Sequence, residues 1–297
     1  MKKVLSVILL AVLVFSLAAC GTQKDESASK ATKTKEVLKI GAIPDQNAAE
    51  LDKGMTAVAK YLSEKTGMKV EFVPSVDYAA LVTGFQRGEI HMAWFGGLTS
   101  VQAISLVPGA KSFAQRPRDA EFHSVFITQP NSGITKLEDL KGKSFTFGSE
   151  SSTSGHLMPR YYLTEAGIDA NKDLDGKPNF SGSHDTTYKL VESGAFKAGA
   201  LNEAVWEAAV KDKKVDTNKV KVFYTTPSFY DYNWTINSNV DDVFGKGATK
   251  KVEDAILSIT TEQKEITDFF QTDKFIETKN SNYEKIQKVA KELNIIK

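Results

Sequence analysis

The stretch KVEFVPSVDYAALVTGFQRGEIHMAWF, Lys69–Phe95, decides the fold. Its two ends, Lys69–Val73 and His91–Phe95, are short apolar runs that predict strands. Between them, Asp77 stands as an N-cap and Gly88 as a terminator of a helix. The apolar residues of that helix recur at helical spacing: Tyr78, Leu81, Val82 and Phe85. A strand, a helix and a second strand in this order predict a parallel sheet with a right-handed crossover.

The same alternation extends to both sides of this stretch. Val37–Ala42 predicts a strand, and the helix that follows it is stopped by Gly67. After two extended segments a second series begins, and helical stripes continue to the C-terminus. The second series is predicted at Ser144–Gly148, Leu157–Ala166, Asn179–Gly182, Thr186–Ser193, Ala198–Leu201, Glu203–Lys211, Val220–Tyr224 and Asn233–Asn237. Two α/β units therefore share one chain.

The pattern predicts two lobes joined by a hinge. If the C-terminal helices return to the first unit, the chain crosses between lobes twice, and the first lobe comprises residues 37–126 and 236–297 and the second 127–235. We expect two mainly parallel sheets with two hinge crossovers. Ligands collect at the carboxyl ends of strands in open α/β sheets. One cleft should therefore lie between the loops that follow Ala42, Phe95, Gly148, Gly182 and Leu201.

The N-terminus predicts export. Two lysines precede an apolar run, Val4–Leu17, and small residues lead to Cys20. This layout predicts a lipoprotein signal peptide over 1–19 with Cys20 as the lipidated residue, and the run is too short to span a bilayer. Residues 20–36 hold almost nothing to bury and predict a flexible tether. We therefore expect a lipid-anchored protein on the extracytoplasmic face of the cell membrane; the alternative is a signal peptide cut elsewhere, with Cys20 incidental.

Charge and cysteine content exclude several classes of function. The chain has 38 basic and 37 acidic residues, and loss of two lysines with the signal peptide leaves a formal charge of −1. This balance offers no basic face for nucleic acid. One cysteine cannot form a disulfide within the chain, so the core alone must hold the fold. The four histidines lack the His-Glu-x-x-His spacing of a zinc site, and no metal or other cofactor is predicted.

The loop Gly148–Gly155, GSESSTSG, lies between a predicted strand and a predicted helix. A helix N-terminus presents free backbone N–H groups, and clustered hydroxyls add donors without adding charge. An oxyanion could be held there without an arginine. The alternative is that one serine simply caps the helix, which needs a single hydroxyl. Pro159 cannot lie deep in a regular helix and suits its first turn.

The turn Ser183–Thr186 follows another strand. His184 could donate a hydrogen bond to an anion, while Asp185 caps the next helix or orients the imidazole. A surface capping turn explains the same residues equally well.

Two further segments could line the cleft. Trp94 and Phe95 precede two glycines that allow close backbone approach, and their rings could exclude water. Aromatic residues in this place are as often part of the core. The segment Tyr230–Trp234 is unusually polar for a crossover strand, and it contains Asp231.

Three segments together resemble a known family. They are VDYAALVTGFQRGEIHMAWFGGLTSV at 76–101, FTFGSESSTSGHLMP at 145–159 and SGSHDTTYKLVESGAFKAGALN at 181–202. From about Leu38 to Trp234 the chain resembles the phosphate/phosphite/phosphonate-type substrate-binding proteins of ABC importers, most of all members described as selenate-binding. The resemblance implies a type II periplasmic-binding-protein fold, a monomer without enzymatic activity, and ABC permease transmembrane subunits as partners.

The resemblance also implies a set of binding residues. In this family a Ser-Thr-Ser-Gly segment binds the oxyanion at a helix N-terminus, a histidine follows in a Ser-His-Asp turn, and an aromatic residue before two small residues lines the cleft. These roles carry over to Ser152, Thr153, Ser154, His184 and Phe95, with Trp94 beside it. Ser100 stands where many members have a tyrosine, which changes the far side of the pocket and bears on phosphonate specificity.

These observations predict a lipoprotein that closes on a small oxyanion and delivers it to a permease. Selenate, selenite, phosphite, phosphate and phosphonate are the ligands considered. One alternative is a ligand-sensing lipoprotein that docks on a membrane receptor. Another is a secreted hydrolase that uses Ser154, His184 and Asp185 or Glu150, although the chain has no Gly-x-Ser-x-Gly motif.

The kind of anion depends on whether the site holds an acceptor. A site made only of donors suits a fully ionised dianion such as selenate, whereas a carboxylate that accepts a proton selects a protonated anion such as hydrogen phosphate. Glu150, Asp185 and Asp231 are the candidates for that acceptor.

Overall fold

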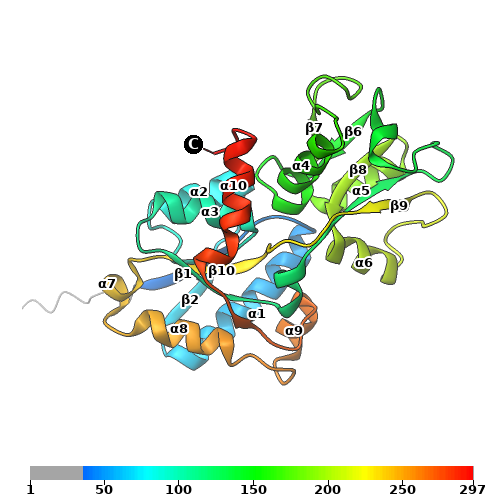
Figure 1. Cartoon of the computed structure of the whole chain (residues 1–297). Helices are drawn as coiled ribbons and strands as arrows, with labels where there is room; N and C mark the ends of the chain where they lie inside the picture. The colour runs from blue at the N-terminus through cyan, green and yellow to red at the C-terminus, as the bar shows by residue number, and fades with distance from the viewer. Residues whose placement is uncertain (1–35, 297) are drawn as a thin grey trace, which may run out of the picture. The chain divides into compact units, whose positions relative to one another are not determined.

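The computed structural model of the chain describes residues 36–296. The predicted signal peptide and Cys20 lie outside the described residues, as does the predicted tether except for its last residue. Two β-sheets with helices packed on them make up the described part (Figure 1). Within residues 36–296, no helix has the length and apolar character needed to cross a membrane.

The first sheet has six strands in the spatial order β11-β4-β10-β3-β1-β2. Its strands are β1 (Val37–Ala42), β2 (Lys69–Phe72), β3 (Met92–Phe95), β4 (Lys111–Gln115), β10 (Asn233–Ile236) and β11 (Ile276–Glu277). β1 pairs in parallel with β2 and β3. β10 runs antiparallel to β3 and β4, and β11 runs antiparallel to β4. The part of the chain built on this sheet is called the first lobe.

The second sheet has five strands in the order β7-β6-β8-β5-β9 and defines the second lobe. Its strands are β5 (Ser124–Thr128), β6 (Phe145–Phe147), β7 (Asn179–Phe180), β8 (Ala198–Asn202) and β9 (Lys221–Thr225). β6 is parallel to β7 and β8, whereas β5 is antiparallel to β8 and β9.

Both sheets are therefore mixed, and the expectation of mainly parallel sheets is wrong. The reason lies in β5 and β10, the two strands that follow the crossings between lobes. Each enters its sheet from the hinge, at the end where the parallel strands finish. It must therefore run away from the cleft, against those neighbours. The predicted arrangement of two sheets, one in each lobe, joined by two crossings is confirmed.

Helices cover both sides of the first sheet. They are α1 (Ala48–Thr66), α2 (Tyr78–Gln86), α3 (Gly97–Leu106), α7 (Val240–Phe244), α8 (Ala248–Leu257), α9 (Lys264–Phe270) and α10 (Glu284–Glu292). α1 packs with α8 and α9, whereas α3 packs with α2 and α10 (Figure 1). The predicted cap of α2 is confirmed, because the Asp77 side chain accepts the N–H of Ala80 at 2.7 Å. Gly67 ends α1 in the left-handed region, at φ 72°.

The second lobe has an apolar cluster on each side of its sheet. Its helices are α4 (Met158–Glu165), α5 (His184–Glu192) and α6 (Glu203–Lys211), and a π-helical turn, Thr153–Leu157, leads into α4. Leu163 of α4 packs in the cluster that contains Phe126. Tyr188 of α5 packs in the cluster that contains Ile127. Neighbouring residues of β5 thus point to opposite faces, as a strand requires.

The two crossings between lobes run side by side at the hinge. Phe122 and Phe229 exchange backbone hydrogen bonds of 2.9 Å in both directions, and the N–H of Asp231 donates to the carbonyl of Asp119 at 3.0 Å. The predicted lobe boundaries after residues 126 and 235 fall inside β5 and β10, and strand pairing puts both crossings slightly earlier in the chain. Short 3₁₀ turns occupy Pro117–Glu121, Leu137–Leu140 and Asn280–Tyr283.

Candidate functional site

Loops at the carboxyl ends of β1, β3, β6, β7 and β8 bring buried polar groups together between the lobes. The cluster is linked by hydrogen bonds across the interlobe boundary. Its members from these loops are Asp45, Gly97, Ser152, Thr153, Ser154, His184 and Asn202; the second crossing adds Asp231 and Tyr232, and α2 adds Tyr78. We call this set the interlobe cluster.

The loop Gly148–Gly155 leads into the π-helical turn and presents its N-terminus to the cluster. Ser152 caps the turn, since its Oγ accepts the N–H of Gly155 at 2.9 Å and its carbonyl accepts the N–H of Leu157 at 3.0 Å. Pro159 lies in the first turn of α4, as expected. The turn itself offers no acceptor to the N–H groups of Thr153 and Ser154. One serine therefore caps, and two neighbouring hydroxyl residues remain for a ligand.

Thr153 also contacts the first lobe. Its Oγ1 accepts the N–H of Leu98, in the first turn of α3, at 2.9 Å. A Cβ on Gly96 would lie 3.1 Å from this oxygen and 3.2 Å from Asp231 Oδ1, so only glycine fits without displacing them. The α3 N-terminus and the N-terminus of the π-helical turn thus meet at Thr153.

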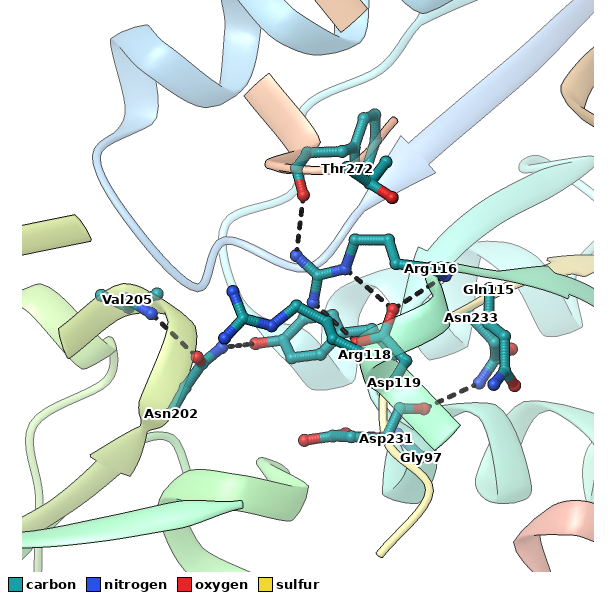
Figure 2. A network of polar contacts seen from close by, with 12 residues as sticks. Gly97, Gln115, Arg116, Arg118, Asp119, Asn202, Val205, Asp231, Asn233 and Thr272 are labelled. Carbon is teal, nitrogen blue, oxygen red and sulfur yellow. Dashed lines mark hydrogen bonds and ion pairs between the residues drawn. The ribbon is translucent and has the colours of Figure 1, made fainter. Parts of the chain in front are cut away.

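Asp231 places a carboxyl group next to the α3 N-terminus. Figure 2 shows this residue beside Gly97. Its Oδ1 accepts the N–H of Gly97 at 2.9 Å. Its Oδ2 is buried and has no hydrogen-bond partner. Burial is the main cause that raises the pKa of Asp231 to about 7. The Gly97 N–H and the nearby hydroxyls of Thr153 and Ser154 lower this pKa in part, although neither hydroxyl forms a hydrogen bond of good geometry with Oδ2. Near neutral pH this carboxyl is therefore partly protonated.

A second unpartnered polar atom is the phenol oxygen of Tyr78. The side chain is 2% exposed at the start of α2, and no hydrogen bond to its hydroxyl is formed within the described residues. Burial and the charges of Asp45 and Asp231 raise its pKa well above the ordinary value. Tyr78 is thus a neutral hydroxyl donor, close enough to Ser152 for that side chain to affect its pKa.

His184 is fully buried and bridges the lobes. Its Nδ1 accepts the backbone N–H of Asn202 at 3.4 Å, so the ring proton is on Nε2, which lies 3.3 Å from the Tyr232 hydroxyl. That hydroxyl donates to Asp45 Oδ2 at 2.8 Å and accepts from Asn202 Nδ2 at 2.8 Å. Burial lowers the pKa of His184 to about 4 and raises that of Asp45 to about 6. The neutral imidazole therefore joins protein groups at both nitrogens, and its predicted role as an anion donor stays a prediction.

The buried arginine at the hinge, Arg116, is already neutralised. Arg116 forms a bidentate pair with Asp119, with Nε–Oδ2 2.8 Å and Nη2–Oδ1 2.7 Å, and its Nη1 donates to the Phe270 carbonyl at 3.1 Å (Figure 2). The guanidinium also lies over the rings of Tyr232 and Trp94, 5.2 and 5.4 Å from their centroids. A buried ion pair of this kind leaves little positive charge for a ligand.

The aromatic residues and the serine singled out from the sequence take three different places. Trp94 borders the interlobe cluster, because it stacks on Tyr232 with ring centroids 5.6 Å apart and lines a small pocket beside Asp45. Phe95 packs in the core, edge-on to Phe85 at 5.5 Å. Ser100 is fully buried and lies 3.0 Å from Ser112 Oγ in a network of hydroxyls.

The three candidate proton acceptors, Glu150, Asp185 and Asp231, lie in different places. Glu150 is exposed. The Asp185 carboxylate accepts a hydrogen bond from Ser183 Oγ at 2.5 Å. It lines an open groove of about 900 Å³, which lies between α1 and α9 on one lobe and α5 and α6 on the other and which we call the outer groove. Asp185 therefore neither caps α5, which Ser183 does, nor orients His184. Of the three carboxylates, the structure places only Asp231 in the interlobe cluster.

Comparison with known proteins decides the family. Residues 40–283 match the family described as ABC transporter, phosphonate, periplasmic substrate-binding protein. This chain belongs to that family. A protein of Prochlorococcus marinus named as a probable ABC transporter phosphite binding protein, PhnD1, is 42% identical over 271 residues, covering 88% of this chain and 91% of the relative.

Solved structures confirm the predicted type II periplasmic-binding-protein fold, and a further relative supports the family. The structure of Prochlorococcus marinus PhnD1 in complex with methylphosphonate has a TM-score of 0.85 at 41% identity and covers 88% of this chain and 99% of that one. A binding protein component of an ABC phosphonate transporter from Pseudomonas aeruginosa, at 23% identity and a TM-score of 0.76, shares the fold over 86% of this chain and 85% of that one. The phosphate-import protein PhnD of Mycolicibacterium smegmatis is 28% identical over 68% of this chain and 66% of its own length.

The hydrolase alternative finds no support in this substrate-binding family or in the local geometry. It requires a hydrogen-bonded series from Ser154 through His184 to Asp185 or Glu150, and Glu150 is exposed. Instead, the ring nitrogens of His184 face Asn202 and Tyr232, and Asp185 bonds Ser183. In the described part of the chain, no group of three or more His, Cys, Asp or Glu side chains could hold a metal ion.

Several members of the cluster were not singled out by the sequence pattern. Asp45, Asn202 and Tyr232 come from three separate segments and meet only through the closure of the lobes. Asp45 and Asn202 do lie in loops predicted to face the cleft. Tyr78 was assigned to an apolar helix stripe, although its place directly after the cap Asp77, beyond the end of β2, is a cleft position.

Proposed function

We propose that this chain captures a small, protonated oxyanion of phosphorus, such as phosphite or a short phosphonate, between its lobes and delivers it to an ABC permease. Family membership supports the transport role. The Prochlorococcus marinus relative, named for phosphite and solved with methylphosphonate, supports the ligand class. In this proposal a lipid on Cys20 holds the protein at the extracytoplasmic face of the membrane.

The single observation that carries the ligand class is the buried carboxyl of Asp231. Its Oδ2 has no protein partner, and Thr153 and Ser154 lie beside it. An oxyanion that carries a proton can donate to this oxygen, whereas sulfate and selenate carry none at neutral pH. Beside the ionised form of Asp231, a fully ionised anion would set like charges together, at a penalty of several kcal/mol. The site thus favours hydrogen phosphite or a hydrogen phosphonate over selenate.

The remaining oxygens of the ligand meet donors that carry no charge. The N–H groups of Thr153 and Ser154 have no acceptor in the π-helical turn, and their hydroxyls and that of Tyr78 add further donors. Backbone N–H groups at a helix N-terminus are a common anion site. Such a cradle holds a negative ligand without an arginine, which agrees with the neutralised state of Arg116.

Binding and closure are coupled in this proposal because the cradle has parts from both lobes. Thr153 and Ser154 belong to the second lobe, and Tyr78 belongs to the first. A ligand that contacts all of them binds the closed arrangement better than an open one, and it shifts the population toward closure by that difference. The closed form is what a permease would distinguish from the empty protein.

Calorimetric titration tests the proposal. The protein without its signal peptide is titrated with phosphite, methylphosphonate, phosphate, selenate and sulfate at neutral pH. We expect phosphite or methylphosphonate to bind more than about tenfold tighter than selenate and sulfate. Equal affinity for selenate and phosphite would defeat the ligand class, and no heat with any oxyanion would defeat the binding function.

A further inference from the structure

A polar relay lies behind the anion-binding loop and contributes nothing to the ligand surface. His156, in the π-helical turn, is 3% exposed. Its Nδ1 lies 2.6 Å from the Glu150 carbonyl oxygen, and its Nε2 lies 2.8 Å from the Nε–H of Arg160. Its ring packs edge-on between Phe147 and Phe180, with centroids 5.0 and 4.8 Å away.

The two partners fix the protonation state of the ring. A carbonyl oxygen only accepts, so Nδ1 must carry the proton; a guanidinium only donates, so Nε2 must present its lone pair. One neutral tautomer satisfies both contacts. Burial acts in the same direction, because it lowers the pKa of His156 to about 4. The ring therefore remains neutral and fixed at neutral pH.

Arg160 is itself held in place. It lies one turn beyond His156, its guanidinium covers the Phe147 ring at 5.2 Å, and its Nη1 donates to Asn171 Oδ1 at 3.2 Å. The relay from Arg160 through His156 thus ends on the backbone of Glu150, whose own side chain is exposed.

The contact with Glu150 fixes the middle of the loop. At its ends, the N–H of Gly148 donates to the Gly155 carbonyl at 2.8 Å, and the N–H of Ser152 donates to the Ser149 carbonyl at 3.0 Å. Between these two points the Glu150 carbonyl could turn outward, and the peptides that lead to Thr153 would turn with it. The His156 ring supplies the contact that holds it inward.

We propose that His156, oriented by Arg160, is a positioning residue that holds the loop in the conformation in which Thr153 and Ser154 present their donors to the anion. This inference rests on the proposed function of the same loop. Neither side chain touches the ligand. The relay prepares the cradle before binding, so that less ordering remains to be done when the anion arrives.

Paired substitutions test the relay. His156→Leu removes both contacts, whereas in His156→Asn an amide N–H can replace Nδ1 and donate to Glu150. His91→Leu is the matched control: His91 is also buried, lies edge-on to Phe244 at 4.9 Å and accepts the N–H of Lys39 at 3.0 Å, but it lies in the first lobe outside the interlobe cluster. Each variant is measured for its Kd for methylphosphonate by calorimetry, for Tm, and for hydrogen exchange at Thr153 and Ser154.

We expect His156→Leu to weaken methylphosphonate binding by about tenfold or more, as loss of an orienting partner does at other sites. His156→Asn should recover part of this, and His91→Leu should lower Tm while leaving Kd unchanged. Exchange at Thr153 and Ser154 should accelerate only in the His156 variants. Should His156→Leu fail to fold, the half-buried Arg160→Met carries the same expectation with a smaller loss.

Two outcomes separate this inference from the proposed function. If the wild-type protein binds no oxyanion of phosphorus, the proposed function fails. If the wild-type protein binds methylphosphonate and the His156 and Arg160 variants bind it equally tightly, the relay is structural only and the inference is overturned. A loss of affinity in His91→Leu as large as that in His156→Leu would overturn it as well.

Discussion

The two carboxylate oxygens of Asp231 have different surroundings. Oδ1 accepts the N–H of Gly97, whereas Oδ2 is buried among hydroxyl groups without a partner. A buried acceptor without a partner destabilises a fold by about 1 to 3 kcal/mol. A ligand that donates a hydrogen bond would recover that free energy, and this is the physical basis of the proposed preference for a protonated oxyanion.

Asp231→Asn should reverse the selectivity. The amide oxygen keeps the Gly97 contact, and the NH₂ group turns the acceptor at Oδ2 into a donor. We expect affinity for methylphosphonate and phosphite to fall by about tenfold and affinity for selenate and sulfate to rise. Calorimetric titration of the five oxyanions measures both changes; an unchanged order of affinities would show that Asp231 does not select the ligand.

The raised pKa of Asp231 should also be visible in stability. Burial raises this pKa from 3.8 to about 7, so the folded protein keeps a proton that the unfolded chain has released. The contribution of this group to the free energy of unfolding therefore falls as pH rises from about 4 to about 7. The histidines with lowered pKa values, His91, His156 and His184, act in the opposite sense at acidic pH.

The difference between wild type and Asp231→Asn isolates this one group. Urea unfolding of both proteins, without ligand, at about pH 5 and about pH 8 should show the variant gaining stability relative to wild type at the higher pH. The same difference at the two pH values would contradict the raised pKa.

Thr153 contributes through both its hydroxyl and its backbone. Thr153→Ala leaves the ligand short of a donor in a buried site, and it also removes the acceptor of the Leu98 N–H. We expect a loss of about 1.5 to 3 kcal/mol in binding free energy for every oxyanion alike. Thr153→Ser, which keeps the hydroxyl, should retain most of the affinity. A loss confined to one oxyanion would argue for a specificity role instead.

Among the elements, α3 brings the first lobe to the site. Its first turn supplies the N–H groups that bond Asp231 and Thr153, and Gly96 lets these oxygens approach the backbone closely. The contact is made at a helix N-terminus, where free N–H groups and the helix dipole favour oxygen atoms that carry negative charge.

Gly96→Ala should therefore disturb the site. The added Cβ would lie 3.1 Å from Thr153 Oγ1 and 3.2 Å from Asp231 Oδ1, so these two hydrogen-bonded oxygens would have to shift by a few tenths of an ångström. We expect methylphosphonate affinity, measured by calorimetric titration, to fall by up to about tenfold. Gly84→Ala in α2, where the Cβ meets only a flexible side-chain atom of Ile90 at 3.3 Å, is the control. Normal affinity in Gly96→Ala would show that the lobes tolerate a gap at this point.

The sequence predicted those helices and strands whose ends are marked by their own capping or terminating residues. Asp77 and Gly88 marked α2, and the alternation of strands and helices marked the two lobes. The pattern missed α3, because two successive glycines are poor helix formers. The start of this helix is stabilised by the contacts of its N–H groups with Asp231 and Thr153, which the local sequence does not show. It also missed the antiparallel direction of β5 and β10, since the end from which a strand enters its sheet is set by the hinge and not by its own residues.

The candidate site was predictable to a similar degree. The hydroxyl loop and Asp231, whose residue types suit an anion at the end of a strand, do lie together in the interlobe cluster, and their role in binding stays a prediction. Asp185 was expected in the same site, yet its side chain bonds Ser183 and faces the outer groove. Which way a helix-start carboxylate turns depends on neighbours that are distant in the sequence.

At the scale of the whole molecule, buried contacts rather than surface charge hold the lobes together. The ion pairs Lys214–Glu50, at 2.8 Å, and Arg118–Glu207, at 2.6 Å, bridge the lobes with partly exposed side chains. Exposed pairs of this kind contribute about 1 kcal/mol or less each. The interlobe cluster, by contrast, is shielded from solvent and joins the two lobes by buried hydrogen bonds. A ligand bound there would therefore add contacts that favour the closed arrangement of the lobes.

If Cys20 carries the proposed lipid, the whole molecule is tied to the membrane. Cys20→Ser removes the only thiol that could accept a lipid. We expect the variant protein to leave the membrane fraction while its purified form binds methylphosphonate with unchanged affinity, since Cys20 precedes the predicted tether. Cell fractionation with immunoblotting measures the first effect. A Cys20→Ser protein that stays in the membrane fraction would refute the anchor.

The most direct test of the central claim is a crystal structure of the protein with methylphosphonate. The account predicts the phosphonate group between the lobes, with one oxygen within hydrogen-bond distance of Asp231 Oδ2 and the others at the N–H groups of Thr153 and Ser154. A ligand bound in the outer groove beside Asp185, or one that leaves Asp231 Oδ2 without a contact, would contradict it.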